Sequence, residues 1–351
     1  MKSAAPPYAA LLTVLFVFAS AGGPAEAQLF KRMKAKRAAA KQEQQRQERK
    51  LAPGEYEWNP ERAPAGPILV VVSIDDQLAY VYRNGVQIAR STVSTGSPGR
   101  DTPTGVFTIL EKKKEHESNI YKGAQMPNMQ RLTWSGIAMH AGQLPGYPAS
   151  AGCVRLPYEF SEKLFGITDK GGTVVVTQRQ ARPSASSRPA SILLASQVDP
   201  GSRPNEALVG KTIWVPERSP SGPVNFLISG RDQTIYVYRN GILIGQSPIG
   251  LRDPHRPIPA GVFLMLEGTD AGAAPVVPGR PARPWAALSL EKEWGPRVVE
   301  DFRRRLYIPP EFATRLYDLA KPGSILVTTS GSSTEQTRSA TDFTIMRPEG
   351  R

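Results

Sequence analysis

The 351-residue sequence contains a single cysteine, Cys153, which follows His140 by thirteen positions. A thiol attacks a carbonyl carbon as its thiolate, and a neighbouring imidazole can take the thiol proton. A lone cysteine is more often a small buried core residue, but Cys153 lies in a glycine-rich loop flanked by prolines rather than in an apolar strand. We therefore predict that Cys153 is a nucleophile and that His140 is its general base.

The residues before Cys153 offer backbone donors next to the sulfur. Ala151 and Gly152 carry small side chains, so we expect their N–H groups, with that of Cys153, to stabilise the oxyanion of a tetrahedral intermediate. Pairing with His140 is expected to lower the pKa of the thiol from about 8.5 towards about 3.5–7.5. These features are typical of a cysteine enzyme that attacks carbonyl groups.

Metal and nucleotide chemistry are not expected from this sequence. It holds three histidines besides the single cysteine, and their spacing does not match a zinc site. No glycine-rich loop follows a strand and opens a helix, as in nucleotide-binding motifs. We therefore predict neither a bound metal nor a cofactor. The histidines are His116, His140 and His255.

The N-terminus predicts a secretory signal peptide that is cut before Gln28. Lys2 provides a charged start, residues 9–19 form an apolar run, and Ala25-Glu26-Ala27 matches a cleavage site. The apolar run is short for a membrane span. We therefore expect a mature protein in an exported, oxidising compartment, where an unpaired cysteine needs either burial or a function.

Basic side chains outnumber acidic ones by 44 to 31, which gives a net charge of +13. Such a charge indicates a polyanionic neighbour, such as nucleic acid, an anionic membrane or an acidic cell-wall polymer. Residues 31–50 hold nine basic and two acidic side chains, so +7 of the charge lies in this segment. Its composition favours helix but provides no apolar face. We interpret it as a solvated, flexible arm, with electrostatic tethering to an anionic surface as the alternative.

A β-rich domain is predicted to begin at residue 67. Residues 68–74 and 78–94 are rich in β-branched and aromatic side chains, and Asn84-Gly85 between two such runs is a strong hairpin signal. Further strands are expected over 105–114, 136–140 and 172–177, and one short helix over 157–167.

The same pattern returns later in the chain. IYVYRNG (235–241) repeats AYVYRNG (79–85) at an offset of 156, and residues 308–329 follow residues 156–177 at an offset of 152. Several matches in one order indicate a duplicated domain. The intervening residues are rich in serine, proline and arginine, which predicts a linker with one short strand over 211–215.

The two copies differ where chemistry is expected. At the offset of 152, Cys153 becomes Arg305 and Arg155 becomes Tyr307, and no histidine occurs in residues 285–290, the segment nearest in pattern to the strand before His140. The scaffold motifs persist in both copies. We conclude that Cys153 and His140 are not required by the fold.

At these residues the sequence resembles the L,D-transpeptidase catalytic domain, also called the YkuD domain. The family pattern is a histidine, a variable loop, and then Ser/Thr-x-Gly-Cys with a hydrophobic residue and Arg or Asn; here it is His140 followed by residues 150–155 (SAGCVR). Residues 94–96 (STG) and 102–107 (TPTGVF) also resemble family strand motifs. Members commonly carry histidine at the position of Ala151, so side-chain assistance from that position is in doubt.

The resemblance implies a periplasmic enzyme that acts on peptidoglycan stem peptides and has no nucleic-acid partner. Cys153 would attack the carbonyl at the L-centre of diaminopimelate and expel the terminal D-Ala. An acceptor would then resolve the acyl-enzyme. An amine of a second stem would give a 3–3 cross-link, a lipoprotein lysine would give an attached protein, and water would give a trimmed peptide. Arg155 would hold a substrate carboxylate or, equally, fix the loop by a hydrogen bond. Ser150 is expected to shape the loop rather than to react.

Two other functions remain open. The Ala151 departure and the second copy are also compatible with an inactive or weakly active peptidoglycan-binding scaffold, and a cysteine carboxypeptidase or endopeptidase would use the same residues. The predicted fold is mainly β, with two tandem YkuD-like β-sandwich domains that each contain a short helix. The predicted parts are a signal peptide (1–27), a basic flexible arm (28–66), a catalytic domain (67–177), a linker (178–223), a non-catalytic repeat (224–329) and a disordered tail (330–351).

Overall fold

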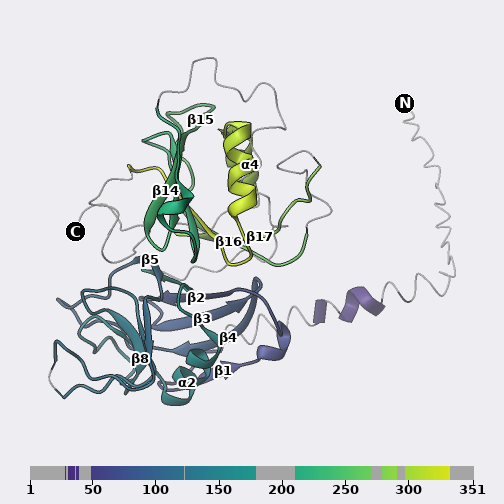
Figure 1. Ribbon diagram of the computed structural model, residues 1–351. Coiled ribbons are helices and arrows are strands. Elements are labelled where there is room, and N and C mark those ends of the chain that lie inside the picture. The colour runs from purple at the N-terminus through teal and green to yellow at the C-terminus, as the bar shows by residue number, and fades with distance from the viewer. Residues whose placement is uncertain are drawn as a thin grey trace, which may run out of the picture. The chain divides into compact units, whose positions relative to one another are not determined.

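The computed structural model describes residues 28, 31–35, 37–38, 49–121, 123–178, 210–269, 279–290 and 297–332 (Figure 1). The predicted signal peptide, most of the linker and nearly all of the tail lie outside the described residues. The chain divides into two compact units, Met1–Lys50 and Leu51–Arg351. In the first unit, residues 31–35 and 37–38 are helical. Among the described helices, none is long and apolar enough to cross a membrane.

The second unit is mainly β, as predicted, and contains two lobes: the first lobe (51–178) and the second lobe (210–332). The largest sheet of the first lobe has six strands in the order β1-β4-β3-β2-β10-β5. β2 and β10 are parallel, and the other neighbours are antiparallel. Asn84 and Gly85 turn the β3–β4 hairpin with φ of 48° and 78°, which confirms the predicted turn. The strands are β1 (Tyr56–Trp58), β2 (Ile68–Ser73), β3 (Leu78–Arg83), β4 (Val86–Thr92), β5 (Gly105–Thr108) and β10 (Thr173–Thr177).

A smaller sheet of the first lobe carries the candidate chemistry. Its four strands have the order β6-β7-β8-β9, and β8 runs parallel to β9. They are β6 (Glu111–Lys113), β7 (Met129–Arg131), β8 (Ala138–Ala141) and β9 (Val154–Leu156). Helix α2 (Tyr158–Ile167) follows β9 and confirms the predicted helix. The two sheets and α2 enclose one apolar core that includes Val70, Val72, Phe107, Leu132, Met139, Val154, Phe160 and Leu164.

The second lobe has the same strand order as the first, with one additional edge strand: β11-β14-β13-β12-β19-β16-β17. Its last helix, α4, occupies the place of α2 in the sequence, and a further helix, α3, precedes it. The strands are β11 (Ile213–Trp214), β12 (Val224–Ser229), β13 (Thr234–Arg239), β14 (Ile242–Pro248), β16 (Gly261–Met265), β17 (Trp285–Ser289) and β19 (Ile325–Thr329). A separate pair is β15 (Gly250–Leu251) with β18 (Leu306–Tyr307), and the helices are α3 (Val298–Arg305) and α4 (Pro310–Leu319).

Both lobes begin earlier than predicted. Residues 51–66 and 210–223 belong to the lobes, because β1 pairs with β4 and β11 pairs with β14. The assignment of these residues to a flexible arm and a linker is therefore wrong. Their proline-rich composition reflects a packed 3-10 turn in each lobe, η1 (Pro60–Arg62) and η4 (Pro216–Arg218). The repeat itself held the missing signal, since WNPERAPAGP (58–67) recurs as WVPERSPSGP (214–223).

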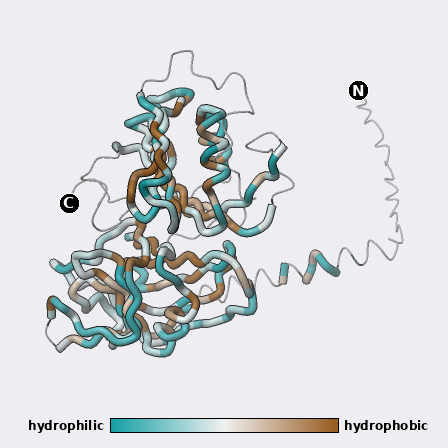
Figure 2. The backbone as a smooth tube through the Cα atoms, viewed as in Figure 1, coloured by the Kyte–Doolittle hydropathy of each residue, from teal (hydrophilic) through white to brown (hydrophobic). Residues whose placement is uncertain are grey.

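A second apolar layer joins the two lobes. It consists of side chains on the sheet faces that point away from each lobe's own core, and Figure 2 shows long hydrophobic stretches along these strands. The Asn84 side-chain oxygen also accepts a hydrogen bond from the Glu267 N–H at 2.8 Å. Each main sheet is therefore buried on both faces. The layer includes Leu69, Val71, Tyr80, Val106 and Val175 of the first lobe and Leu227, Val262, Leu264, Ile325 and Val327 of the second.

Candidate active site

The parallel pair β8–β9 brings the predicted residues to one cavity. His140 lies in β8 opposite Arg155 in β9, and Cys153 directly precedes β9. The cavity has a volume of about 690 Å³. Within the described residues, no group of three or more His, Cys, Asp or Glu side chains is arranged to hold a metal ion. The predicted site residues that line the cavity are His140, Ser150, Ala151, Cys153 and Arg155. Gly152 is buried and does not line it.

The surroundings of His140 favour the neutral form of its imidazole, which is the form that can accept a proton. Its Nδ1 lies 2.8 Å from the carbonyl oxygen of Ala141. A carbonyl oxygen can only accept, so Nδ1 carries the proton and Nε2 has a free lone pair. Burial lowers the pKa of His140, and the positive charge of Arg155 lowers it further, against the opposing effect of the Ala141 hydrogen bond.

The thiol of Cys153 lies in apolar surroundings, against Met126, Met129 and Ala138. Burial raises the pKa of Cys153, and a hydrogen bond from the Ala138 backbone and the charge of Arg155 oppose this only in part. The thiol donates to the carbonyl of Gly136 at 3.5 Å. The predicted lowering of the thiol pKa is therefore wrong, because desolvation outweighs the nearby positive charge. Both shifts favour a neutral thiol and a neutral imidazole, so attack by this thiol would require a base that takes its proton.

Ser150 closes the loop in front of the nucleophile. Its hydroxyl donates to the Cys153 carbonyl at 2.5 Å and accepts from the Gly152 N–H at 3.1 Å. The Gly152 N–H is thus engaged within the loop, contrary to the expectation that it is free for an oxyanion. In the described part of the chain, the N–H groups of Ala151 and Cys153 make no such hydrogen bond. These two donors remain for the oxyanion hole.

Thr102 fixes the same loop from behind, a role that the sequence analysis missed. Its hydroxyl donates to the Gly152 carbonyl at 2.8 Å and accepts from the Gly96 N–H at 2.8 Å. Gly152 itself has a φ of +108°, and a Cβ there would lie 2.8 Å from Ile137 Cδ1. The sequence contained a signal for Thr102, because the matching motif 156 positions later has Ile258 in its place.

Arg155 places a positive charge in the cavity. Its side chain is half-buried and passes Gly142, where a Cβ would lie 3.1 Å from Arg155 Cδ. Among the described residues, its guanidinium makes no hydrogen bond and no ion pair. Within the described residues, no loop atom therefore accepts a hydrogen bond from the Arg155 guanidinium, which remains available to a ligand.

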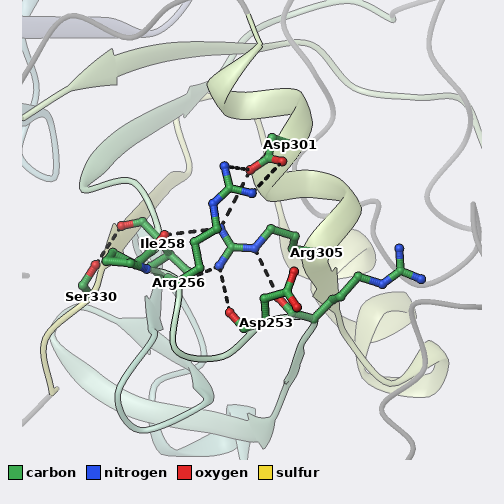
Figure 3. Close-up of polar contacts among 8 residues, drawn as sticks. Asp253, Arg256, Ile258, Asp301, Arg305 and Ser330 are labelled. Atoms are coloured by element: carbon green, nitrogen blue, oxygen red, sulfur yellow. Dashed lines mark hydrogen bonds and ion pairs between the residues drawn. The ribbon is translucent and has the colours of Figure 1, made fainter.

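The second lobe fills the equivalent position with a cation. Tyr307 pairs with Gly250 as Arg155 pairs with Ser94, so Arg305 takes the place of Cys153. The Arg305 side chain is 5% exposed. Its guanidinium donates to four backbone carbonyls in the loop before β16 (Figure 3). They belong to Arg252, Asp253, Arg256 and Pro257. This position thus holds a buried structural cation instead of a thiol.

One family model matches a segment of the first lobe. Residues 67–176 match the YkuD family, described as the L,D-transpeptidase catalytic domain. This match falls within the first lobe, in the segment that holds His140 and Cys153. No curated protein matches the chain.

Solved structures of L,D-transpeptidases resemble part of the chain. One from Stackebrandtia nassauensis is 30% identical, with 34% of this chain and 58% of that chain covered and a TM-score of 0.30. One from Mycobacterium smegmatis is 22% identical, with 32% and 59% covered and a TM-score of 0.30. One from Mycobacterium tuberculosis H37Rv is 24% identical, with 32% and 58% covered and a TM-score of 0.30. The match thus spans less than two thirds of each of these chains.

Proposed function

We propose that this protein is a periplasmic L,D-transpeptidase that acts on peptidoglycan stem tetrapeptides through an acyl-enzyme on Cys153. The observation that carries the proposal is the shared cavity of Cys153, His140 and Arg155 within the segment that matches the catalytic family. A neutral imidazole and a protonated thiol that line one cavity support base-assisted attack on a carbonyl.

The first step forms a thioester and releases D-Ala. The Cys153 sulfur attacks the carbonyl at the L-centre of diaminopimelate while His140 Nε2 takes the thiol proton. The N–H groups of Ala151 and Cys153 stabilise the negative oxygen of the tetrahedral intermediate. The C–N bond then breaks, and His140 returns the proton to the leaving amine.

The second step consumes the thioester. An acceptor amine loses its proton to His140 and attacks the thioester carbonyl, and the Cys153 thiolate leaves. An amine from a second stem gives a 3–3 cross-link, and a lipoprotein lysine attaches a protein. Water gives net carboxypeptidase activity by the same route.

The experiment that tests this proposal detects the acyl-enzyme directly. Mature protein incubated with a disaccharide-tetrapeptide is expected to release D-Ala and to carry a tripeptide adduct on Cys153 by mass spectrometry. Cys153→Ala should give neither product. Absence of both products from the reduced wild-type protein would favour the inactive scaffold, and loss of existing muropeptide dimers would favour an endopeptidase.

Export and surface tethering form a second part of the proposal, supported by the cleavage motif and by the +7 charge of residues 31–50. We expect the protein in the periplasmic fraction with Gln28 as its first residue.

Replacing the nine basic residues of segment 31–50 with glutamine should release more protein from sedimented cell walls at low salt. Detection of an intact leader by mass spectrometry would contradict the predicted cleavage. An unchanged amount of protein in the sedimented cell walls would contradict the predicted tethering.

Thr102→Val should lower kcat by about 10- to 100-fold with little change in KM, because the loop that carries Cys153 loses its anchor while the cavity keeps its charges. Thr102→Ser keeps the hydroxyl and should restore most of kcat. Steady-state D-Ala release and a thermal melt of each variant check this. Equal kcat for Thr102→Val and wild type would show that the Gly152 carbonyl needs no such anchor.

A further inference from the structure

The turn before β5 and β16 carries an arginine in both lobes. In the first lobe the Arg100 N–H donates to the Ser97 carbonyl at 2.8 Å, and in the second lobe the Arg256 N–H donates to the Asp253 carbonyl at 3.0 Å. Asp253 follows Ser97 by 156 positions, and Arg256 follows Arg100 by the same offset. Arg100 and Arg256 therefore occupy the same place in the two lobes.

In the second lobe this arginine holds a carboxylate. Arg256 Nη1 donates to Asp301 Oδ1 at 3.1 Å, and Arg256 Nη2 lies 3.0 Å from Asp301 Oδ2, which is a two-pronged contact (Figure 3). Asp301 belongs to α3, the helix that ends at Arg305, where the first lobe has Cys153. The second lobe thus shows an arginine of this turn binding a carboxylate that approaches from the nucleophile's side.

In the first lobe the equivalent guanidinium faces the catalytic cavity. Arg100 is exposed and lines the same cavity as Cys153 and Arg155. Its guanidinium lies 6.0 Å from the centre of the Tyr121 ring, and within the described residues it makes no hydrogen bond or ion pair. No aspartate or glutamate is among the described residues that line the cavity. The site therefore offers two cations and no internal acid.

We infer that Arg100 binds a carboxylate of the peptide substrate and thereby determines specificity, an inference that rests on the proposed function. A stem tetrapeptide has two carboxylates near the bond that breaks, one on the diaminopimelate side chain and one at the terminal D-Ala. Two guanidinium groups, Arg100 and Arg155, match these two charges. Carboxylate is the shared chemistry, and amidated substrates identify which of the two Arg100 binds.

The test compares Arg100→Gln with wild type on three tetrapeptides: the parent, one amidated on the diaminopimelate side chain, and one amidated at its C-terminus. On the parent, Arg100→Gln should raise KM by about 10- to 100-fold, since one charged hydrogen-bonded contact is lost. Wild type should show the same rise on the peptide that lacks the bound carboxylate. On that peptide alone, Arg100→Gln should have the same KM as wild type. On the parent peptide, Arg100→Lys should have a KM between those of wild type and Arg100→Gln.

Arg256→Gln is the matched control, because it changes the same turn in the second lobe and should leave KM unchanged. Wild-type turnover is measured first, so an inactive wild type counts against the proposed function rather than against Arg100. With active wild type, an unchanged KM for Arg100→Gln on the parent would overturn the inference. An equal rise on all three peptides would also overturn it, because the effect would then not depend on a carboxylate.

Discussion

Replacing His140 with glutamine is expected to lower the rate of Cys153 acylation by about 10²- to 10⁴-fold at neutral pH. Burial raises the pKa of Cys153, so very little thiolate forms without help. Glutamine can donate to the Ala141 carbonyl as Nδ1 does, but it cannot accept a proton. Single-turnover mass spectrometry with the tetrapeptide gives the acylation rate directly.

The pH dependence separates this role from a merely structural one. The proposed base is the neutral form of His140, and the pKa of His140 is lowered, so wild-type kcat/KM should persist below pH 6.5, the ordinary histidine value. It should fall only as the pH drops through the lowered pKa. His140→Gln should lose this acid limb and gain rate at alkaline pH as thiolate forms. If the acid limb of the wild-type profile is unchanged in His140→Gln, the titrating group is not His140.

Arg155 offers a matched check on these electrostatics. Its charge lowers the pKa of both His140 and Cys153. Arg155→Gln should therefore shift the acid limb to higher pH and shift the pH dependence of Cys153 alkylation by iodoacetamide to higher pH as well. Shifts in opposite directions, or none, would contradict the assigned cause.

Replacing Arg305 with leucine should reduce the free energy of unfolding by about 1–3 kcal/mol, because loop carbonyls lose their donor. The guanidinium of buried Arg305 is the donor for four carbonyls of an exposed loop, and leucine leaves these carbonyls without that donor. Each unsatisfied group costs about 1–3 kcal/mol, with partial relief from rearrangement or water. Denaturant unfolding monitored by circular dichroism measures the change.

Arg304 supplies the control for that experiment. It lies on the same helix, α3, but its side chain is 72% exposed and pairs with Glu300 at the surface. Arg304→Leu should change the free energy of unfolding by less than about 0.5 kcal/mol. Similar values for the two variants would mean that the carbonyls around Arg305 find other donors.

Local sequence patterns predicted the parts of the fold that local chemistry determines. Asn84-Gly85 tolerates positive φ, and the apolar spacing of residues 157–167 suits a helix, so both elements were predicted correctly. Cys153 and His140 line a common cavity, and their assigned chemical roles stay predictions.

The failures concern contacts between distant segments. The thiol pKa depends on Met126 and Met129, which precede Cys153 by more than twenty residues, and composition does not show that they surround the sulfur. Thr102 reaches Gly152 across 50 positions. Proline-rich residues 51–66 were assigned to an arm because a packed turn and a solvated segment share the same composition.

The apolar layer between the lobes determines how the molecule unfolds. Val70 and Val72 of β2 face the core of the first lobe, while Leu69 and Val71 face the second lobe. Losing the second lobe would therefore expose one whole face of the six-stranded sheet of the first lobe to water. The lobes should melt in a single cooperative transition instead of two, so that thermal inactivation of the catalytic site follows the stability of a lobe that contains no cysteine.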